Sequence, residues 1–259
     1  MPRFAANLTM LFTEQPFVDR FSAAGRAGFS AVEFLFPYEF SADELANRLA
    51  EENLQQVLFN LPPGDWDAGE RGVAALPGRQ SEFLESMEQA LEYARALKCP
   101  TLHVMAGIPI GETSQDEALE VYVENLRLAC DAASYQAITI VIEPLNTRDV
   151  PGYLFSRSDQ AGQIIDKVGR DNIGLQLDLY HCQIMEGDLE TRIRDLANVI
   201  RHIQIAGVPA RNEPDTGEVN YPHLFKIIDD IDYDGWVGCE YNPRGSTKQG
   251  LGWFQAAKS

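Results

Sequence analysis

The sequence predicts an α/β protein that folds as a single (β/α)8 TIM barrel over residues 1–259. Short apolar runs, rich in branched and aromatic residues, alternate eight times with longer amphipathic segments. The length of 259 residues is also typical of one such barrel. A doubly wound open sheet is the alternative. It is weakened because residues 7–10, after the first strand, contain no glycine-rich phosphate loop.

The expected elements follow one another in a regular order. Strands are expected at residues 4–7, 31–34, 55–60, 101–105, 139–143, 173–178, 200–205 and 236–240. Helices are expected at residues 17–27, 81–97, 116–133, 158–168, 189–196 and 221–230. Gly28 is a plausible stop for the first helix. Ser41 and Glu44 form a capping-box signature ahead of Leu45, which predicts a further helix there.

Charge and composition exclude several functional classes. The formal net charge of −18 disfavours contact with phosphate backbones and anionic membranes, so we expect no nucleic-acid or membrane partner. No stretch approaches the ~20 apolar residues of a membrane span, and the N-terminus has no secretory pattern. A cytoplasmic location is therefore expected. The four cysteines lack Cys-x-x-Cys spacing, which favours reduced, buried thiols over zinc or disulfides.

Four polar residues close four otherwise apolar strands: Glu143, Asp178, Gln204 and Glu240. A carboxylate at the end of a buried strand is costly unless it is paired or binds a metal. In a (β/α)8 barrel the ends of successive strands meet on one face. Three carboxylates and an amide there would form an oxygen-rich site for a divalent cation, and the neutral amide favours Mg²⁺ or Mn²⁺ over Zn²⁺. Taken singly, each carboxylate could instead be a helix cap or a salt-bridge partner.

The same residues suit proton transfer next to a carbonyl group. Glu143 and Glu240 come from the fifth and eighth strands, roughly opposite each other in a barrel. One could remove a proton from one carbon while the other delivers a proton to the neighbouring carbon. Asp178 and Gln204 would complete the protein ligands of the cation, which would stabilise an enediolate.

Four further residues are candidate substrate contacts. His181 could polarise the substrate carbonyl, or it could be a loop histidine bonded to backbone. His103 could serve the site or be a satisfied core histidine. Arg211 could bind a substrate carboxylate through a bidentate fork, or pair internally with Glu213 or Glu218. Trp66 belongs to a long loop that is either a lid over the site or a simple packed loop.

Several segments in order along the chain resemble the hydroxypyruvate isomerase family, within the xylose-isomerase-like barrels that include ketose 3-epimerases. They are residues 3–8, 32–38, 63–72, 142–146, 176–181, 213–221 and 235–243. The resemblance implies a (β/α)8 barrel that interconverts hydroxypyruvate and 2-hydroxy-3-oxopropanoate (tartronate semialdehyde). The proton-transferring glutamates of the family match Glu143 and Glu240. Its metal-ligand positions match Glu143, Asp178, Gln204 and Glu240.

The resemblance leaves some choices open. The related ketose epimerases usually have His where Gln204 stands, a departure that argues for a smaller acid substrate. A close sister family isomerises 2-oxo-tetronates with much the same motifs. Barrels of this group often pair, so a homodimer or a higher homo-oligomer is open. A ketose 3-epimerase, a metal-dependent endonuclease and a non-catalytic sugar-acid sensor are the other classes considered.

Overall fold

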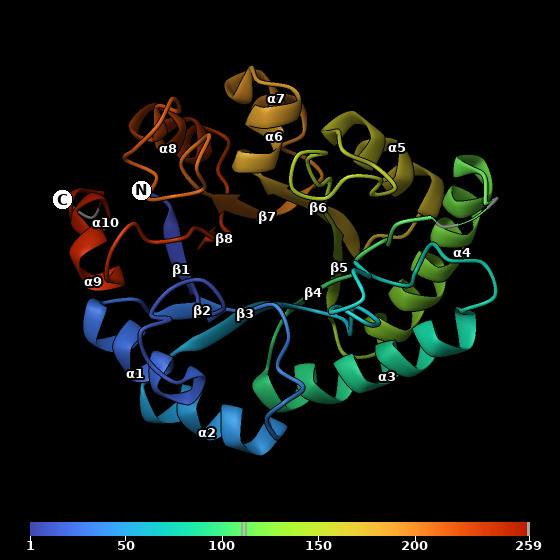
Figure 1. Cartoon of the computed structure of the whole chain (residues 1–259), viewed down its shortest axis with the longest axis horizontal. Helices are drawn as coiled ribbons and strands as arrows, with labels where there is room; N and C mark the ends of the chain where they lie inside the picture. Colours follow the sequence, from blue (N-terminus) through green and yellow to red (C-terminus); the bar gives the residue numbers. More distant parts are fainter. Residues whose placement is uncertain (110, 112, 258–259) are drawn as a thin grey trace.

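A closed barrel of eight parallel strands forms the centre of the molecule in the computed structural model (Figure 1), which describes residues 1–109, 111 and 113–257. The strands are β1 (Arg3–Asn7), β2 (Ala31–Glu33), β3 (Gln55–Asn60), β4 (Thr101–His103), β5 (Thr139–Ile142), β6 (Ile173–Asp178), β7 (Ile200–Ile205) and β8 (Trp236–Cys239). Each strand pairs with its sequence neighbours, and β8 closes onto β1. The predicted barrel is confirmed, and the open sheet is excluded.

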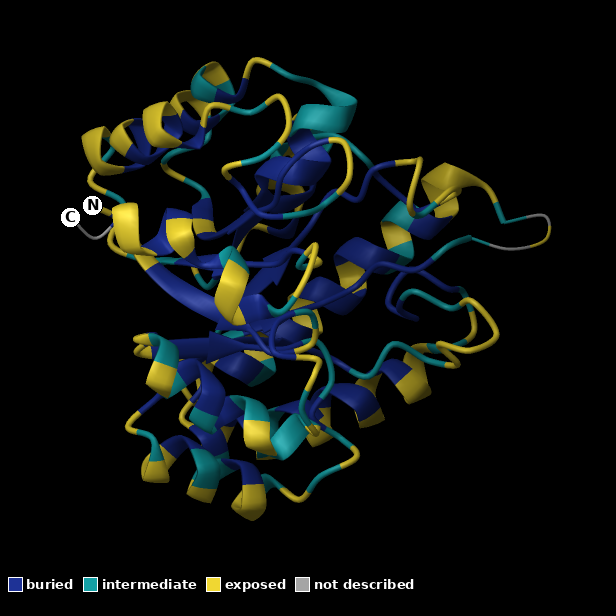
Figure 2. Cartoon of the chain, turned by 60° about the vertical axis from the view of Figure 1, so that its left-hand side comes forward, coloured by how far each residue is buried: buried dark blue, intermediate teal, exposed yellow. Residues whose placement is uncertain are grey.

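The helices form an outer ring around the barrel (Figure 1). They are α1 (Phe17–Ala27), α2 (Ala42–Glu51), α3 (Gln80–Leu97), α4 (Gln115–Ser134), α5 (Ser158–Val168), α6 (Leu179–Met185), α7 (Leu189–Asp195), α8 (Tyr221–Asp230), α9 (Thr247–Gly250) and α10 (Gly252–Ala256). Figure 2 shows their outer faces exposed and their inner faces buried against the strands. Among the described residues, no helix combines the length and apolar character needed to cross a bilayer.

Local sequence signals account for several helix ends. Gly28 ends α1 in the left-handed conformation, which a residue without a Cβ adopts at little cost. The Ser41 hydroxyl accepts a hydrogen bond from the Glu44 backbone N–H and caps α2 as predicted. Helix α6 was not predicted; it begins directly after Asp178 at the end of β6, with no loop between strand and helix.

The core is continuous between the barrel and the helices. Aromatic side chains close the seam between β1 and the C-terminal helices: Phe29 stacks on Phe254 with ring centroids 4.1 Å apart, and Phe4 packs edge-on against Trp253. The four cysteines are buried and free, as the sequence indicated. This packing fixes the positions of the strand ends on which the site is built.

Candidate active site

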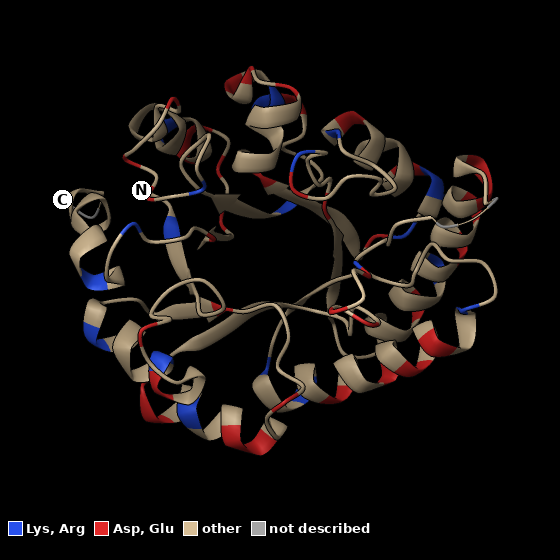
Figure 3. Cartoon of the chain, viewed as in Figure 1, with Lys and Arg blue, Asp and Glu red and all other residues tan. Residues whose placement is uncertain are grey.

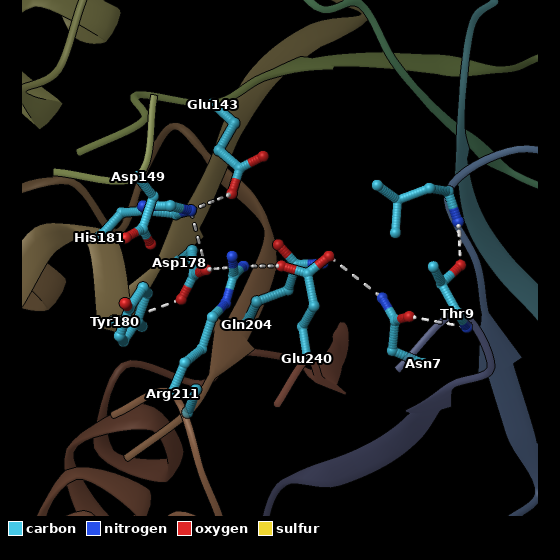
Figure 4. A network of polar contacts seen from close by, with 12 residues as sticks. Asn7, Thr9, Glu143, Asp149, Asp178, Tyr180, His181, Gln204, Arg211 and Glu240 are labelled. Atoms are coloured by element: carbon cyan, nitrogen blue, oxygen red, sulfur yellow. Dashed lines mark hydrogen bonds and ion pairs between the residues drawn. The ribbon is translucent and has the colours of Figure 1, made fainter. Parts of the chain in front are cut away.

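The four predicted strand-end residues lie together at the C-terminal ends of β5 to β8 (Figure 4). Asp178 is the last residue of β6 and pairs in register with Gln204 in β7. Glu143 and Glu240 come one residue after β5 and β8 end, a difference within the usual uncertainty of strand boundaries. All four side chains are buried, so their charges face one another with little screening by water.

Asp178 has two separate roles in this arrangement. Its Oδ1 accepts a hydrogen bond of 2.8 Å from the Tyr180 backbone N–H and so caps α6. Its Oδ2 lies 3.5 Å from His181 Nε2 and 3.4 Å from Arg211 Nη2. The helix-cap interpretation therefore accounts for only one oxygen, and the other remains available to the site.

His181 lies on the first turn of α6 and not in a loop, and its tautomer follows from its contacts. Its Nδ1 accepts a hydrogen bond of 3.1 Å from the Asn146 backbone N–H. Burial and the nearby Arg211 charge hold the pKa of His181 well below its usual value, so the ring is neutral. Nε2 must then carry the proton, and it lies 3.5 Å from Asp178 and 3.9 Å from Glu143. His181 is thus a hydrogen-bond donor at the carboxylates.

Arg211 supplies the positive charge of the cluster. Its Nη2 bonds Glu240 Oε2 and lies 3.4 Å from Asp178 Oδ2, while its guanidinium carbon is 4.9 Å from the centre of the Tyr180 ring. Neither Glu213 nor Glu218 is its partner, because they bond Arg244 and Gln183 respectively. Arg211 Nε is buried without a hydrogen-bond partner in the described part of the chain. One donor of the guanidinium is therefore free for a ligand.

Crowding of buried carboxylates raises their pKa values. Burial raises the pKa of Glu240 to about 8, and that of Asp178 to about 6, while Arg211 opposes both shifts. Burial, with Glu240 and Asp178 as like charges, raises the pKa of Glu143 well above its usual value. Such raised values are typical of carboxylates that carry protons in catalysis or bind a cation.

The residues present fit a divalent cation. The ligand atoms of Glu143, Asp178 and His181 lie within 4.8 Å of one another, and Glu143 Oε1 is buried without a hydrogen-bond partner among the described residues. Because His181 Nε2 carries a proton, oxygen atoms are the available ligands. A buried, oxygen-rich group of this kind matches the ligand preference of hard cations.

Amide side chains donate hydrogen bonds to both Glu240 and Gln204, and Arg211 bonds Glu240 as well. Asn7 Nδ2 donates to Glu240 Oε1 at 3.2 Å (Figure 4), and it also donates to Glu33 Oε1 at 3.0 Å. Gln204 donates through Nε2 to Glu33 at 2.8 Å, and its carbonyl oxygen accepts from Gln176 at 2.6 Å. Both side chains are therefore held by protein contacts in the absence of a ligand.

The other two predicted substrate contacts, His103 and Trp66, have further partners of their own. His103 Nδ1 is 3.2 Å from the Asn60 amide oxygen and 3.7 Å from Glu143, and burial lowers its pKa to about 3. It borders the site as a neutral side chain. Trp66 is half-exposed and packs between Phe36, at 5.1 Å, and the Arg71 guanidinium, at 3.7 Å. The packed-loop interpretation therefore describes Trp66 in this structure.

Sequence reasoning missed site neighbours that carry the same signal. Asn7 and Glu33 also end apolar strands, and they pair in register across β1 and β2. Asn60 and His103 end β3 and β4 in the same way. Applying the strand-end rule to all eight strands would have identified Asn7 and Glu33.

Comparison with known proteins identifies the family. A family model described as the xylose isomerase-like TIM barrel matches residues 21–257. The chain belongs to this family. Two similar members are the 2-oxo-tetronate isomerase of Cupriavidus necator, 54% identical, and the hydroxypyruvate isomerase of Escherichia coli, 46% identical. In both comparisons, the alignment covers 98% of each chain.

Solved structures of other proteins have a similar fold. The structure titled AP endonuclease, family 2, from Brucella melitensis is 52% identical, with a TM-score of 0.97 over 99% of each chain. The D-psicose 3-epimerase of Clostridium cellulolyticum is 17% identical, with a TM-score of 0.76 over 95% of this chain and 87% of the epimerase. At that identity the epimerase supports the fold alone.

Proposed function

We propose that the chain moves a proton between C3 and C2 of a short hydroxylated 2-oxo acid, and that hydroxypyruvate is such a substrate. The chain is an isomerase, since full-length relatives at 46–54% identity are named isomerases. The observation that carries the proposed reaction is the pair of buried glutamates with raised pKa values, Glu143 and Glu240, beside the Asp178–His181–Arg211 group.

The proposed roles follow from the protons that each side chain holds. One of Glu143 and Glu240 removes the C3 proton to give an enediolate, and the other delivers a proton to C2, while the hydroxyl proton of O3 passes to O2 as the carbonyl moves to C3. The Nε2–H of His181 donates to a substrate oxygen that gains negative charge. The unpaired donor of Arg211 binds the substrate carboxylate. Burial of the group excludes water from the enediolate.

A divalent cation, Mg²⁺ or Mn²⁺, is part of the proposal. Glu143, Asp178, Gln204 and Glu240 would hold it, as the family resemblance implies. When bound, it would act as a Lewis acid for the negative charge on the substrate oxygens. The buried, unpartnered Glu143 oxygen supports this assignment, because an isolated buried carboxylate oxygen otherwise lacks compensation.

Two substrates of different length are compatible with this chemistry. Hydroxypyruvate would give 2-hydroxy-3-oxopropanoate, in line with the segments that resemble the three-carbon enzymes. A 2-oxo-tetronate has one additional hydroxymethyl carbon, and the same C3-to-C2 transfer would give its 3-oxo form. This second candidate is favoured by two 2-oxo-tetronate isomerases at 54% and 52% identity, against 46% for the hydroxypyruvate isomerase, while a third 2-oxo-tetronate isomerase is 45% identical.

An NMR assay in deuterated water tests the reaction and the substrate together. We expect conversion of at least one of the two acids, with solvent deuterium at C2 of the product, because the donating glutamate exchanges its proton with water. The assay is run without enzyme, with EDTA, and with added Mg²⁺ or Mn²⁺. Binding of both acids without conversion would overturn the isomerase proposal and favour a sugar-acid sensor.

The same protein samples, assayed with other substrates, distinguish the remaining functional classes. Conversion of fructose or tagatose in preference to both acids would indicate a ketose 3-epimerase. Cleavage of DNA at an abasic site would support the activity in the Brucella title. We propose no such activity, because the net charge is −18 and acidic residues are spread over the outer helices, notably α2 and α3 (Figure 3).

We also propose that residues 1–259 form a single catalytic domain of a cytoplasmic enzyme that takes a small 2-oxo acid and has no nucleic-acid or membrane partner. A homodimer or higher homo-oligomer is the proposed assembly. Size-exclusion chromatography with light scattering distinguishes both from a monomer of 28.9 kDa.

Arg211→Gln tests the carboxylate contact. We expect KM for the acid to rise by about tenfold or more, since a charge-assisted hydrogen bond contributes roughly 1.5–3 kcal/mol. Arg211→Lys keeps the charge without the planar fork and should have an intermediate KM. Mn²⁺ should bind the Gln variant more tightly, because a positive charge beside Asp178 and Glu240 has been removed. An unchanged KM in both variants would rule out a substrate contact.

A further inference from the structure

Glu33 is a fully buried carboxylate to which the proposed mechanism assigns no role. It ends β2 and has 0% exposed surface. Its Oε1 accepts from Asn7 at 3.0 Å and from Gln204 at 2.8 Å, and its Oε2 lies 2.6 Å from His202 Nε2. The three partners come from β1 and β7, so one carboxylate joins strands on different sides of β8.

The barrel provides space for this carboxylate at one position in β8. A Cβ placed on Gly238 would lie 2.3 Å from Glu33 Oε2 and 2.4 Å from Oε1, so any side chain there would displace the Glu33 carboxylate. Gly238 pairs in register with Gln204 on one side and Ala5 on the other. A glycine in a strand often marks such a close approach. The space beside Gln204 is therefore reserved for Glu33.

The carboxylate determines which way two amides face. A carboxylate only accepts hydrogen bonds, so both Asn7 and Gln204 must turn their NH2 groups toward Glu33. The Gln204 carbonyl then faces away from Glu33, and Asn7 presents Nδ2 to Glu240 Oε1 at 3.2 Å. On the other side of each amide a donor faces the oxygen: the Thr9 backbone N–H lies 3.1 Å from Asn7 Oδ1, and Gln176 Nε2 lies 2.6 Å from Gln204 Oε1. Both orientations therefore depend on Glu33 together with these donors.

We infer that Glu33 is a positioning residue that fixes the amides of Asn7 and Gln204 and thereby sets the Glu240 carboxylate and the Gln204 carbonyl for the reaction. The inference rests on the proposed function, because it assigns the task of Glu33 to that site. Glu33 reaches Glu240 through Asn7, and it reaches the proposed cation through Gln204.

Glu33→Met is the direct test, because it keeps the length of the side chain and removes Oε1, the acceptor that both NH2 groups share. We expect kcat to fall by about tenfold or more and the Kd for Mn²⁺, measured by calorimetry, to rise by a similar factor, as is typical of residues that orient metal ligands. Since Glu33 does not touch the substrate, KM should change less than twofold. Glu33→Asp keeps the charge but shortens its reach, so it should show the same losses if position matters.

Two controls separate positioning from general destabilisation. Gln56→Met introduces methionine at another buried side chain, whose one side-chain hydrogen bond among the described residues goes to the Leu58 carbonyl, and it should leave kcat and the Mn²⁺ Kd unchanged. In a double-mutant cycle, Asn7→Ala and Glu33→Met should cost no more together than the larger single effect, because Glu33 reaches Glu240 through Asn7.

The outcomes are distinct. Near-normal kcat and Mn²⁺ Kd in both Glu33 variants, or additive effects with Asn7→Ala, would overturn the positioning role. Absence of isomerase activity in the wild-type protein would instead overturn the proposed function. The Glu33 inference would then be decided by the Mn²⁺ Kd and by a crystal structure of the Glu33→Met variant, in which the amide of Gln204 or Asn7 should have rotated.

Discussion

Glu143→Gln and Glu240→Gln should each lower kcat by about 10²–10⁴-fold, the usual contribution of a positioned general acid or base. Glutamine keeps the shape of the side chain but can neither accept nor release the transferred proton. Because the two steps occur in series, loss of either glutamate should block the overall reaction. Steady-state rates with both acids, together with deuterium incorporation at C2, measure the effect.

In contrast to kcat, the unfolding temperature of the metal-free Glu143→Gln variant should not fall. The raised pKa of Glu143 means that its charge is unfavourable in the folded protein. Glutamine removes that charge, so the metal-free Glu143→Gln protein should unfold at an equal or higher temperature than the wild type. Lost activity with retained stability would point to the chemical step and not to the fold.

Glu186→Gln is the matched control for both variants. The Glu186 side chain is 1% exposed and bonds the backbone and hydroxyl of Ser158, with Arg192 nearby, so it is a buried carboxylate outside the site. It should lower the unfolding temperature and leave kcat near normal. Near-normal turnover in either active-site variant would disprove the two-glutamate mechanism.

The sequence predicted the barrel and the four strand-end residues because both depend on short-range patterns. An apolar run that ends in Glu143 or Asp178 is visible without any tertiary information, and barrel topology then brings the strand ends together. The same rule extended to Asn7 and Glu33 would have identified the amide and carboxylate that support Glu240. Their omission came from limiting the rule to the later strands.

Other features depend on contacts that no local pattern encodes. Arg211 has a left-handed backbone with φ of 54°, and its partners Asp178 and Glu240 are about 30 residues away on either side. The tautomer of His181 depends on the backbone N–H of Asn146, which comes from the loop after β5. Residue types alone therefore suggested Arg211 and His181 as candidates but could not specify their geometry.

The second large effect concerns pH and the proposed cation. The metal-free protein should lose stability as the pH rises from about 5 to 9. Folding raises the pKa of Asp178 to about 6 and that of Glu240 to about 8, so the folded state holds protons that the unfolded chain has released. Each unit of pKa shift corresponds to about 1.4 kcal/mol. In a chain of this size, each kcal/mol shifts the unfolding temperature by roughly 2–4 °C.

Bound Mn²⁺ or Mg²⁺ should reverse this trend, because a cation favours the ionised carboxylates that burial disfavours. The gain in unfolding temperature on adding Mn²⁺ to EDTA-treated protein should therefore increase from pH 5.5 to pH 8.5. Calorimetry in two buffers of different ionisation enthalpy should show protons released on binding. In Glu240→Gln the gain should be smaller and its pH dependence weaker, since one titrating ligand is absent. A gain in unfolding temperature that does not change with pH and releases no proton would show that the cation binds elsewhere. At this site, the carboxyl groups with raised pKa values must lose a proton to become charged ligands.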